Sequence, residues 1–553
     1  MDPRVPNLSF DLVIVGAGVA GCVLASRISH ARPDLRILLI EAGVDKDDRV
    51  LPALGLAGGF DSSIEWNYRS VPQPRGFGGD VVNLTSGKIV GGGSAVNYQA
   101  FTRGPAVDYD QWADLVQDQR WSWSSLLPYF KKSETWYPSA ELKEKGLITA
   151  DVHGYDGPIK VSHATNSGKP RNYPLREKTR RFHELRGCKQ AVDINDGQPG
   201  GYAEGFNSTY DGLRSYAAGY VLGESVTLWT HAFVERVIIS GTTAKGVIAT
   251  RLVGDKKEHF LVEATKEVIL SAGAQSSPKI LLLSGVGPAA DLAQHSISPV
   301  VELPVGHNYA DHPAIFTYWS IDLPNAVLGD GEMQSPNLDW TAGLPYDWIS
   351  FAPADQKTRA LAKQVLDPAR YKRYSAEGKL QVEAFVVNPP APGWPAKGVF
   401  TIAHILVDPV SRGTVSLRSG NPADSPTLNP ELLASPVDRS ALYECVRDCA
   451  RAIQDVEGLD AVEWGVDDSL RGDWSDEAID NRARRMGSGT VFHPSGTCSM
   501  GQVVDGDCRV LGIDGLRVVD AGVIPIPLAA HYQAPMYAIA EQVGIEPGCW
   551  KFR

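Results

Sequence analysis

A glycine-rich turn near the start of the sequence has the residue types and spacing that bind a dinucleotide. The turn Gly16-Ala17-Gly18-Val19-Ala20-Gly21 follows an apolar, β-branched stretch from Phe10 to Val15. Its glycines let the backbone approach a pyrophosphate, and free N–H groups at the start of the next helix stabilise the negative charge. Glu41 stands at the end of the next expected strand, where a carboxylate can bind ribose hydroxyls. The pattern predicts a dinucleotide site, without separating FAD from NAD, at Gly16, Ala17, Gly18, Gly21, Glu41 and Ala42.

A second glycine-rich stretch separates the two cofactors. It reads Gly87-Lys88-Ile89-Val90-Gly91-Gly92-Gly93-Ser94-Ala95-Val96-Asn97, and its small residues let the backbone lie against a planar ring or a phosphate. The string resembles the first signature of the glucose/methanol/choline (GMC) family of FAD oxidoreductases. Residues 273–287 are similar to the family's second signature, and residues 306–312 are similar to its G-x-N-x-x-D-H segment. The resemblance implies FAD as the cofactor.

The sequence after residue 490 contains two histidines that the resemblance makes catalytic. His493 opens the stretch His493-Pro494-Ser495-Gly496-Thr497, and His531 follows later. The resemblance implies that His493 lies beside flavin N5 as the general base, with His531 as a second, hydrogen-bonding member. An imidazole with an ordinary pKa near ~6.5 can accept a hydroxyl proton at neutral pH. The pair Asp311 and His312 is expected to lie away from the flavin ring and to be structural, as is His307.

Further cofactor contacts follow from the same resemblance. Trp66 corresponds to a family tryptophan near the flavin, although an aromatic residue in a loop is as often part of the core. Val96 stands where members with a covalent flavin often carry histidine, so FAD is expected to be held without a covalent bond. The other residues assigned to the cofactor are Val90, Gly92, Ser94, Asn97, Val234, Asp520, Ala521, Tyr532 and Gln533.

The elements that must position these residues predict an α/β fold. Alternating or continuous apolar runs predict strands over Phe10–Val15, Leu35–Ile40, Val226–Trp229, Val234–Ile239, Gly246–Leu252, His259–Glu263, Glu267–Leu270 and Leu516–Val519. Helices are expected over Val23–Ser29, from Ser277, and near 357–375, 437–456 and 535–543, and long loops over 46–110. The resemblance implies a discontinuous Rossmann-type FAD-binding domain (1–160, 213–305, 491–553) and an α+β substrate-binding domain (161–212, 306–490).

Composition excludes several classes of partner. The 553 residues suit two or more domains, and a net charge of -12 disfavours nucleic acid and anionic membranes. Apolar runs are too short for a bilayer span, and the N-terminus lacks a secretory pattern, so a cytoplasmic protein is expected. The seven cysteines lack C-x-x-C spacing, so no metal site is expected. Cys445 and Cys449, one helical turn apart, are expected to pack in the core.

These observations together predict an enzyme that takes a hydride from the CH–OH group of an alcohol or hydrated aldehyde to FAD, which O2 or another acceptor reoxidises. The alternatives are a lyase of the same fold that retains FAD and, more distantly, an NAD-dependent or nonenzymatic protein. The substrate pocket is expected to include Trp340, Trp348, Phe351 and Phe385. Aromatic residues favour an apolar or aromatic alcohol over a sugar, although sugar sites also use aromatic platforms. The sequence leaves the substrate, the oligomeric state and the choice of oxidase or dehydrogenase open.

Overall fold

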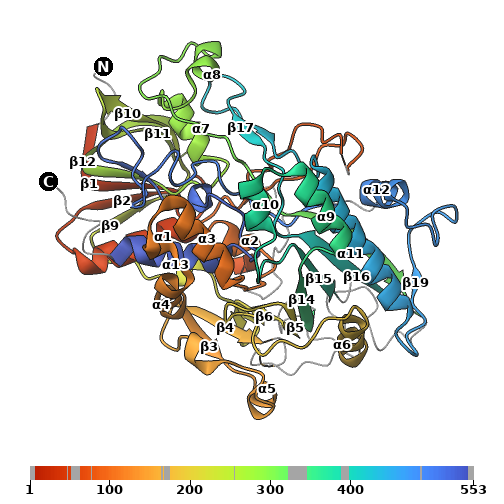
Figure 1. Cartoon of the computed structure of the whole chain (residues 1–553). Coiled ribbons are helices and arrows are strands. Elements are labelled where there is room, and N and C mark those ends of the chain that lie inside the picture. Colours follow the sequence, from red (N-terminus) through yellow and green to blue (C-terminus); the bar gives the residue numbers. More distant parts are fainter. Residues whose placement is uncertain are drawn as a thin grey trace.

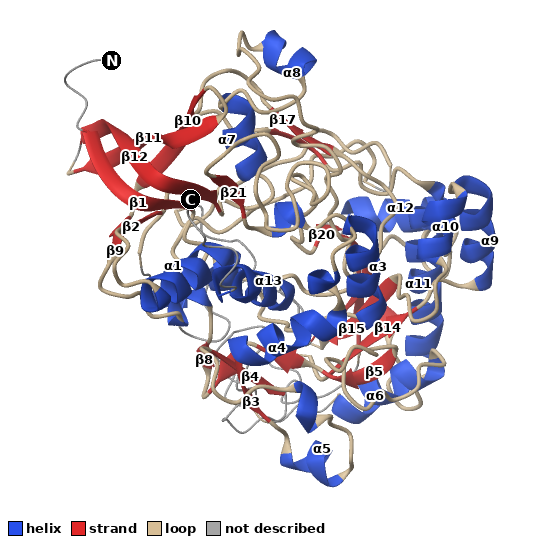
Figure 2. Cartoon of the chain, turned by 60° about the vertical axis from the view of Figure 1, so that its left-hand side comes forward, coloured by secondary structure: helices blue, strands red, loops and turns tan. Residues whose placement is uncertain are grey.

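The strands of the computed structural model form two seven-stranded sheets, which Figure 2 shows at its upper left and lower right. The structure describes residues 7–45, 48–50, 63–75, 77–163, 166, 175–254, 256–321, 346–387, 398–485 and 488–545. The first sheet contains β1 (Asn7–Val15), β2 (Ile37–Ile40), β9 (Val226–Trp229), β10 (Ala232–Ser240), β11 (Thr243–Val253), β12 (Lys256–Leu270) and β21 (Leu516–Val518). The second contains β5 (Gly201–Glu204), β13 (Pro313–Ser320), β14 (Trp348–Ala352), β15 (Val382–Val387), β16 (Val399–Leu406), β19 (Val462–Glu463) and β20 (Gly489–Thr490).

The first sheet has a parallel core. β1 pairs in parallel with β12 on one side and with β2 on the other, and β2 pairs in parallel with β9. All four residues of β2 are buried, which is typical of a parallel strand covered on both faces. The helix α1 (Val19–Ala31) connects β1 to β2 and packs against the C-terminal helix α13 (Gln533–Ile545), as Figure 1 shows. This parallel core is the α/β arrangement that the glycine turn predicts.

One long strand replaces two expected short strands in this sheet. β12 continues through Ala264–Glu267 because β1 pairs with it on both sides of a bulge at that point. The first half of β12 also pairs antiparallel with β11, and its end pairs in parallel with β21. The expected strands His259–Glu263 and Glu267–Leu270 are therefore parts of a single element.

The second sheet is antiparallel and has two distinct faces. Phe351 on β14 lies directly opposite Glu383 on β15, which lies opposite Ile405 on β16. The next positions, Ala384 and His404, point to the other side, because side chains alternate along a strand. We call the face of Glu383 the front face and the face of Ala384 the back face. The back face packs against the long helix α11 (Pro436–Gln454), which lies beside β16 in Figure 1.

Shorter elements complete the fold. The remaining helices are α2 (Gly93–Val96), α3 (Ala106–Val116), α4 (Trp123–Ser133), α5 (Ala140–Glu144), α6 (Arg176–Leu185), α7 (Ser277–Leu283), α8 (Ala289–Gln294), α9 (Gln356–Val365), α10 (Pro368–Tyr374) and α12 (Asp476–Arg485). Small sheets are formed by β3 (Glu134–Tyr137), β4 (Ile159–His163) and β6 (Phe206–Asn207), by β7 (Thr209–Tyr210) and β8 (Leu213–Arg214), and by β17 (Thr414–Ser416) and β18 (Thr427–Asn429). The expected helix near 357–375 is two helices, because Pro368 disfavours helical backbone in the residue before it.

The strands of each seven-stranded sheet lie within the residue ranges of one expected domain. Every strand of the first sheet falls within 1–160, 213–305 or 491–553, and every strand of the second within 161–212 or 306–490. The boundaries themselves stay a prediction, since strands do not define where loops and helices belong. No helix in the described part of the chain combines the length and the apolar character that crossing a bilayer requires.

Candidate active site

The predicted dinucleotide residues meet at one edge of the first sheet. Gly16 follows β1 and donates its N–H to the carbonyl of Ile40 at the end of β2 (2.8 Å). Ser271, just after β12, donates to the carbonyl of Val15 (2.7 Å). Because the carboxyl ends of parallel strands share an edge, the turns that follow β1, β2, β12 and β21 converge there, as in other open α/β sheets that bind ligands.

The two glycine-rich segments predicted to hold the cofactor are in direct contact. The N–H of Gly91 donates to the carbonyl of Ala17 (2.7 Å), and a Cβ added to Gly92 would lie only 2.8 Å from Cα of Gly18. Gly92 has φ 53° and ψ -133°, a backbone conformation that glycine alone adopts readily. A Cβ on Gly21 would lie 1.9 Å from the carbonyl oxygen of Gly16. The glycines thus form a backbone cradle that fits a dinucleotide.

Glu41 braces this cradle. Its Oε2 accepts a hydrogen bond from the N–H of Ala17 (3.0 Å), and its Oε1 accepts one from the N–H of Gly43 (2.9 Å). Burial raises the pKa of the Glu41 carboxyl, while these N–H groups oppose the shift. Ala42 lies between Glu41 and Gly43 in the chain. The carboxylate therefore stands at the turn, and its expected contact with a ribose stays a prediction.

Two predicted cofactor residues near the second cradle segment are held by their neighbours. Ser94 donates its hydroxyl to the carbonyl of Gly91 (2.6 Å), and it accepts from the N–H of Ala217 (3.1 Å). Asn97 accepts a hydrogen bond from Arg214 Nη1 at its Oδ1 (2.7 Å). These contacts fix the conformation of the segment that follows Val90 and Gly92, whose predicted contacts with the cofactor stay predictions.

Asp520 joins the C-terminal block to the second-signature turn. Its Oδ2 accepts from the N–H of Gly273 (2.9 Å) and from the hydroxyl of Ser277 (2.6 Å), and its Oδ1 accepts from Gly522 N–H (2.8 Å). Burial raises the pKa of this carboxyl. Since both oxygens are already bonded, a contact with the cofactor is expected from the backbone at Ala521 rather than from the Asp520 side chain.

The remaining predicted contacts lie in two places. Trp66 stacks on Tyr68 with ring centroids 5.7 Å apart and lies 6.2 Å from Phe233, the neighbour of Val234 on β10. Gln533 begins α13 and donates through Nε2 to the carbonyl of Ala100 (2.9 Å). Trp66 and Val234 therefore share one region beside β10, while Gln533 belongs to the C-terminal block.

Three histidines and a tyrosine form a compact cluster at the C-terminal block. His493 Nδ1 lies 2.9 Å from His312 Nδ1, and the ring centroids of His493 and His531 are 5.0 Å apart. Tyr532 stacks on His493 at 5.1 Å with an angle of 18° between the rings. The two histidines predicted to be catalytic are thus neighbours.

The β13–β20 pairing places two of these histidines. Pro313 at the start of β13 pairs with Thr490 at the end of β20, so His312 and His493 lie at the same end of the ladder. Asp311 Oδ1 then accepts from the backbone N–H of both His312 and His493 (2.8 Å each). The residue before His493, Phe492, has φ 60°, a strained conformation for a bulky residue. Backbone strain of this kind is common at functional sites.

His312 contacts a residue that is predicted to be catalytic. The sequence predicts that His312 is structural and lies away from the flavin ring, which stays a prediction, and the structure places its ring in a hydrogen bond with His493. The G-x-N-x-x-D-H segment gives no sign of this, because its contact depends on the pairing of two strands distant in sequence. His307, by contrast, is exposed, and it stays outside the cluster as predicted.

Burial sets the protonation state of the cluster. It lowers the pKa of His312 to about 3 and that of His493 well below its ordinary value, and the neighbouring histidines add to both effects. It raises the pKa of Asp311 to about 7, against the effect of the two N–H donors. His312 and His493 are therefore neutral at pH 7, and one of their two facing Nδ1 atoms must carry the hydrogen.

Glu383 on the front face of the second sheet holds His531. Its Oε1 lies 2.9 Å from His531 Nε2, and the carboxylate is 1% exposed. Sequence analysis did not assign Glu383, since an acidic residue inside an apolar strand is visible only as a break in the pattern. The backbone N–H of His531 is also fixed, by the hydroxyl of Thr102 (2.8 Å). The imidazole of His531 is thus oriented by a buried carboxylate.

The described aromatic residues expected to line the substrate pocket lie on different faces of the second sheet. Phe351 lies opposite Glu383, and Phe385 follows it by two residues, so both share the front face. Trp348 points to the back face, where its ring lies 4.3 Å from the Arg176 guanidinium, so it does not share a face with Phe351 and Phe385. Trp340 lies outside the described residues.

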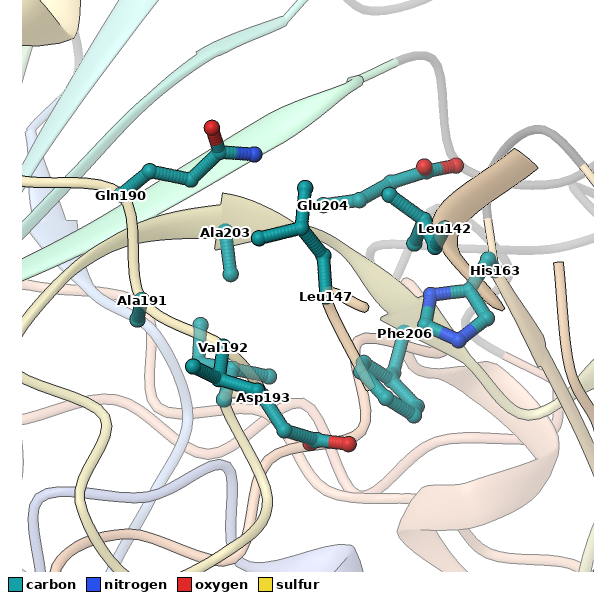
Figure 3. Close-up of a pocket in the computed structure, with 11 residues that line it drawn as sticks. Leu142, Leu147, His163, Gln190, Ala191, Val192, Asp193, Ala203, Glu204 and Phe206 are labelled. Carbon is teal, nitrogen blue, oxygen red and sulfur yellow. The ribbon is translucent and has the colours of Figure 1, made fainter. Parts of the chain in front are cut away.

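A small cavity lies apart from this cluster, between α5, β5 and the chain near residue 192. Figure 3 shows His163, Glu204 and Asp193 around it. Its volume is about 10 Å³, room for a single water molecule. The cavity is therefore too small for a flavin or an organic substrate.

Comparison with known proteins identifies the family. A family model described as GMC oxidoreductase matches residues 10–314, and a second model of the same description matches residues 409–540. The chain belongs to the GMC oxidoreductase family. It is 33% identical to the GMC-type oxidoreductase acuG of Aspergillus aculeatus, over 97% of this chain and 98% of that protein. It is 31% identical to pyranose dehydrogenase 3 of Leucoagaricus meleagris, over 98% and 93%.

Solved structures of GMC oxidoreductases have the same fold. The crystal structure of a formate oxidase superposes with a TM-score of 0.85 at 26% identity and covers 97% of this chain and 98% of its own. The protein is thus an FAD oxidoreductase with the expected Rossmann-type FAD-binding domain and α+β substrate-binding domain. A formate oxidase of Aspergillus oryzae RIB40 has been studied for FAD modification, so family membership alone does not define how the flavin is attached.

Proposed function

We propose that this GMC oxidoreductase oxidises the CH–OH group of an alcohol or of a hydrated aldehyde, with His493 as the general base. The observation that carries the proposal is the contact of His493 with both His312 and His531. It supports different roles for the two neighbours, because His312 can position the proton on His493 and His531 can orient the substrate hydroxyl. Positioned acid–base groups of this kind contribute about 10²–10⁴-fold to a rate.

The hydrogen bond between the two Nδ1 atoms decides which tautomer can act as the base. For His493 to accept a proton at Nε2, its Nδ1 must carry the hydrogen and donate it to Nδ1 of His312. Within the described chain, no hydrogen bond involves Nε2 of His493, so that atom is available to a substrate hydroxyl. His312 is therefore a positioning residue that selects the basic tautomer of His493.

His531 orients the hydroxyl in this proposal. Glu383 accepts a hydrogen bond from His531 Nε2, which leaves Nδ1 of His531 to contact the substrate oxygen. The contact with the buried carboxylate also fixes the orientation of the His531 ring. The substrate oxygen would therefore lie between two imidazoles with different tasks.

FAD would be held by the glycine cradle, by Glu41 and by the backbone after Asp520, and when bound it accepts the hydride and passes electrons to O2 or another acceptor. Noncovalent binding is supported by Val96, which has no nucleophilic atom for a bond to the flavin. The donor is not set by the family, since its members include a pyranose dehydrogenase and a formate oxidase. Phe351 and Phe385 favour a donor with an apolar or aromatic group.

Anaerobic stopped-flow reduction of the bound FAD tests this proposal. A panel of alcohols and aldehydes identifies a donor that bleaches the flavin absorbance. With that donor, His493→Ala should slow flavin reduction by about 10²–10⁴-fold and retain FAD. His307→Ala is the matched control, because His307 is exposed, and it should reduce at the wild-type rate.

Two outcomes would contradict the proposal. A lyase of this fold would convert its substrate without bleaching the flavin, so turnover with an oxidised spectrum excludes the redox function. If His493→Ala reduced its flavin at the normal rate and His531→Ala showed no flavin reduction, the role of base would belong to His531.

A further inference from the structure

Behind the second sheet, three side chains with metal-binding atoms face one another. Cys445 and Cys449 lie on α11, and His404 lies on β16. One ligand atom from each residue lies within 4.8 Å of the other two. The cluster is buried, with Cys449 and His404 at 0% exposure and Cys445 at 5%. It belongs to the back face and is separated by the sheet from Glu383.

The local structure presents all three atoms to one point. Residues four apart on a helix share one face, so both thiols of α11 point towards the sheet. His404 lies opposite Ala384 on the back face, so its ring points towards α11. The same helical spacing places paired ligands on a metal in the H-E-x-x-H motif.

One ring nitrogen of His404 has no partner. Nε2 lies 3.0 Å from the hydroxyl of Thr317, whereas buried Nδ1 makes no hydrogen bond with any described residue. A buried polar atom without a partner costs free energy, so its persistence points to a ligand at Nδ1. Contacts such as that with Thr317 commonly orient metal-bound histidines through the second ring nitrogen.

The charges around the cluster suit a divalent ion. Arg186 lies 3.9 Å from Cys445 Sγ, and its own charge is balanced by Asp448 at 3.0 Å. Two thiolates would therefore balance a doubly charged cation.

We propose that Cys445, Cys449 and His404 bind a zinc ion that ties α11 to the back face of the second sheet. Thiolate and imidazole ligands together favour zinc among common divalent ions. Zinc–sulfur bonds of about 2.3 Å need sulfur atoms about 3.8 Å apart in a tetrahedron, so small side-chain rotations would close the site. Three protein ligands leave one tetrahedral position for a water molecule.

Metal analysis of the FAD-loaded enzyme tests the proposal. The enzyme is produced in zinc-supplemented medium without a histidine tag, and metals are measured by plasma mass spectrometry. Wild-type protein should contain about one zinc ion per chain, and Cys445→Ser, Cys449→Ser and His404→Gln should each lose most of it. Cys188→Ser is the matched control, because Cys188 is a cysteine outside the cluster, and it should keep the zinc.

X-ray absorption at the zinc edge keeps the test independent of variant folding. The wild-type spectrum should show about two sulfur neighbours near ~2.3 Å and one nitrogen near ~2.0 Å. Zinc below about 0.1 ion per chain, or a spectrum without sulfur neighbours, would overturn the site, because a structural zinc site binds tightly. Zinc retained in all three ligand variants, or another metal in its place, would also overturn it.

Discussion

At the scale of single residues, the two histidines proposed to be catalytic differ in their hydrogen-bond partners. His493 contacts a neutral imidazole, His312, whereas His531 contacts a buried carboxylate, Glu383. Burial keeps His493 neutral, so its ring can accept a proton, whereas Glu383 fixes the orientation of the His531 ring. In the proposed mechanism, His493 therefore takes the proton and His531 orients the hydroxyl.

Glu383→Gln should weaken the second contact without removing it. The amide oxygen can still accept from His531 Nε2, but the hydrogen bond loses its charge assistance, worth about 1 kcal/mol, or roughly fivefold in rate. We expect flavin reduction to slow by about fivefold in Glu383→Gln and by more in Glu383→Ala, with FAD content unchanged in both. Equal rates in the wild type and Glu383→Ala would show that His531 does not need the carboxylate.

The depressed pKa of His312 predicts a loss of stability in acid. His312 titrates near 3 in the folded state and near 6.5 when unfolded, so the unfolded chain binds the extra proton between these values. The stability that this group contributes is present above pH 6.5 and declines as pH falls towards 3, by about 1.4 kcal/mol per pH unit. His312→Gln should flatten the acid limb of the unfolding free energy, measured by urea titration with excess FAD. Parallel curves for the two proteins would contradict this.

The sequence assigned the site residues that stand in recognisable motifs, but it did not assign those that reach the site only through strand pairing. His493 and His531 stand in a motif, so the resemblance assigned them. Glu383 and His312 enter the site through strand pairing, which brings together residues far apart in the sequence. Periodicity does place Glu383 on a strand face, but it does not say which face meets the histidines.

At the scale of elements, the contact between the two glycine segments governs the cofactor site. Gly92→Ala should disrupt it, because the new Cβ would lie 2.8 Å from Gly18 Cα on a backbone that disfavours side chains. Overpacking and strain of about 2–4 kcal/mol would lower FAD affinity by about 10²-fold. Gly93→Ala is the matched control, since a Cβ there meets nothing within 4 Å. FAD content after gel filtration measures both, and equal loss would contradict the role of this contact.

The strands of the first sheet could be predicted from their continuous or alternating apolar runs. β9 begins and ends where the sequence predicts, at Val226 and Trp229. The strands of the second sheet were not located individually, although a sheet was expected there. β15 and β16 are almost fully buried on both faces, so their alternation is hidden. The helix α3 begins inside the stretch 46–110 that was expected to form loops, and the sequence analysis assigned no helix to α4.

At the scale of the whole molecule, FAD would contact segments from both ends of the chain. Acid precipitation of the enzyme should leave free FAD in the supernatant, because Val96 provides no covalent attachment. Readdition of FAD to the apoprotein should raise its Tm, since a ligand at 100 times its Kd stabilises by about 2.7 kcal/mol. Mass spectrometry of the released flavin shows whether it is modified. Yellow colour retained in the pellet would show a covalent bond.

The alternation along β15 has a consequence for how this enzyme can evolve. Glu383 serves the histidine cluster, and its neighbour Ala384 packs towards α11. Inserting or deleting one residue in the strand would exchange these faces, placing a carboxylate among the core residues of α11 and an apolar side chain beside His531. Lineages with new donors should therefore differ by substitutions at Phe351 and Phe385, while the length of β15 stays constant.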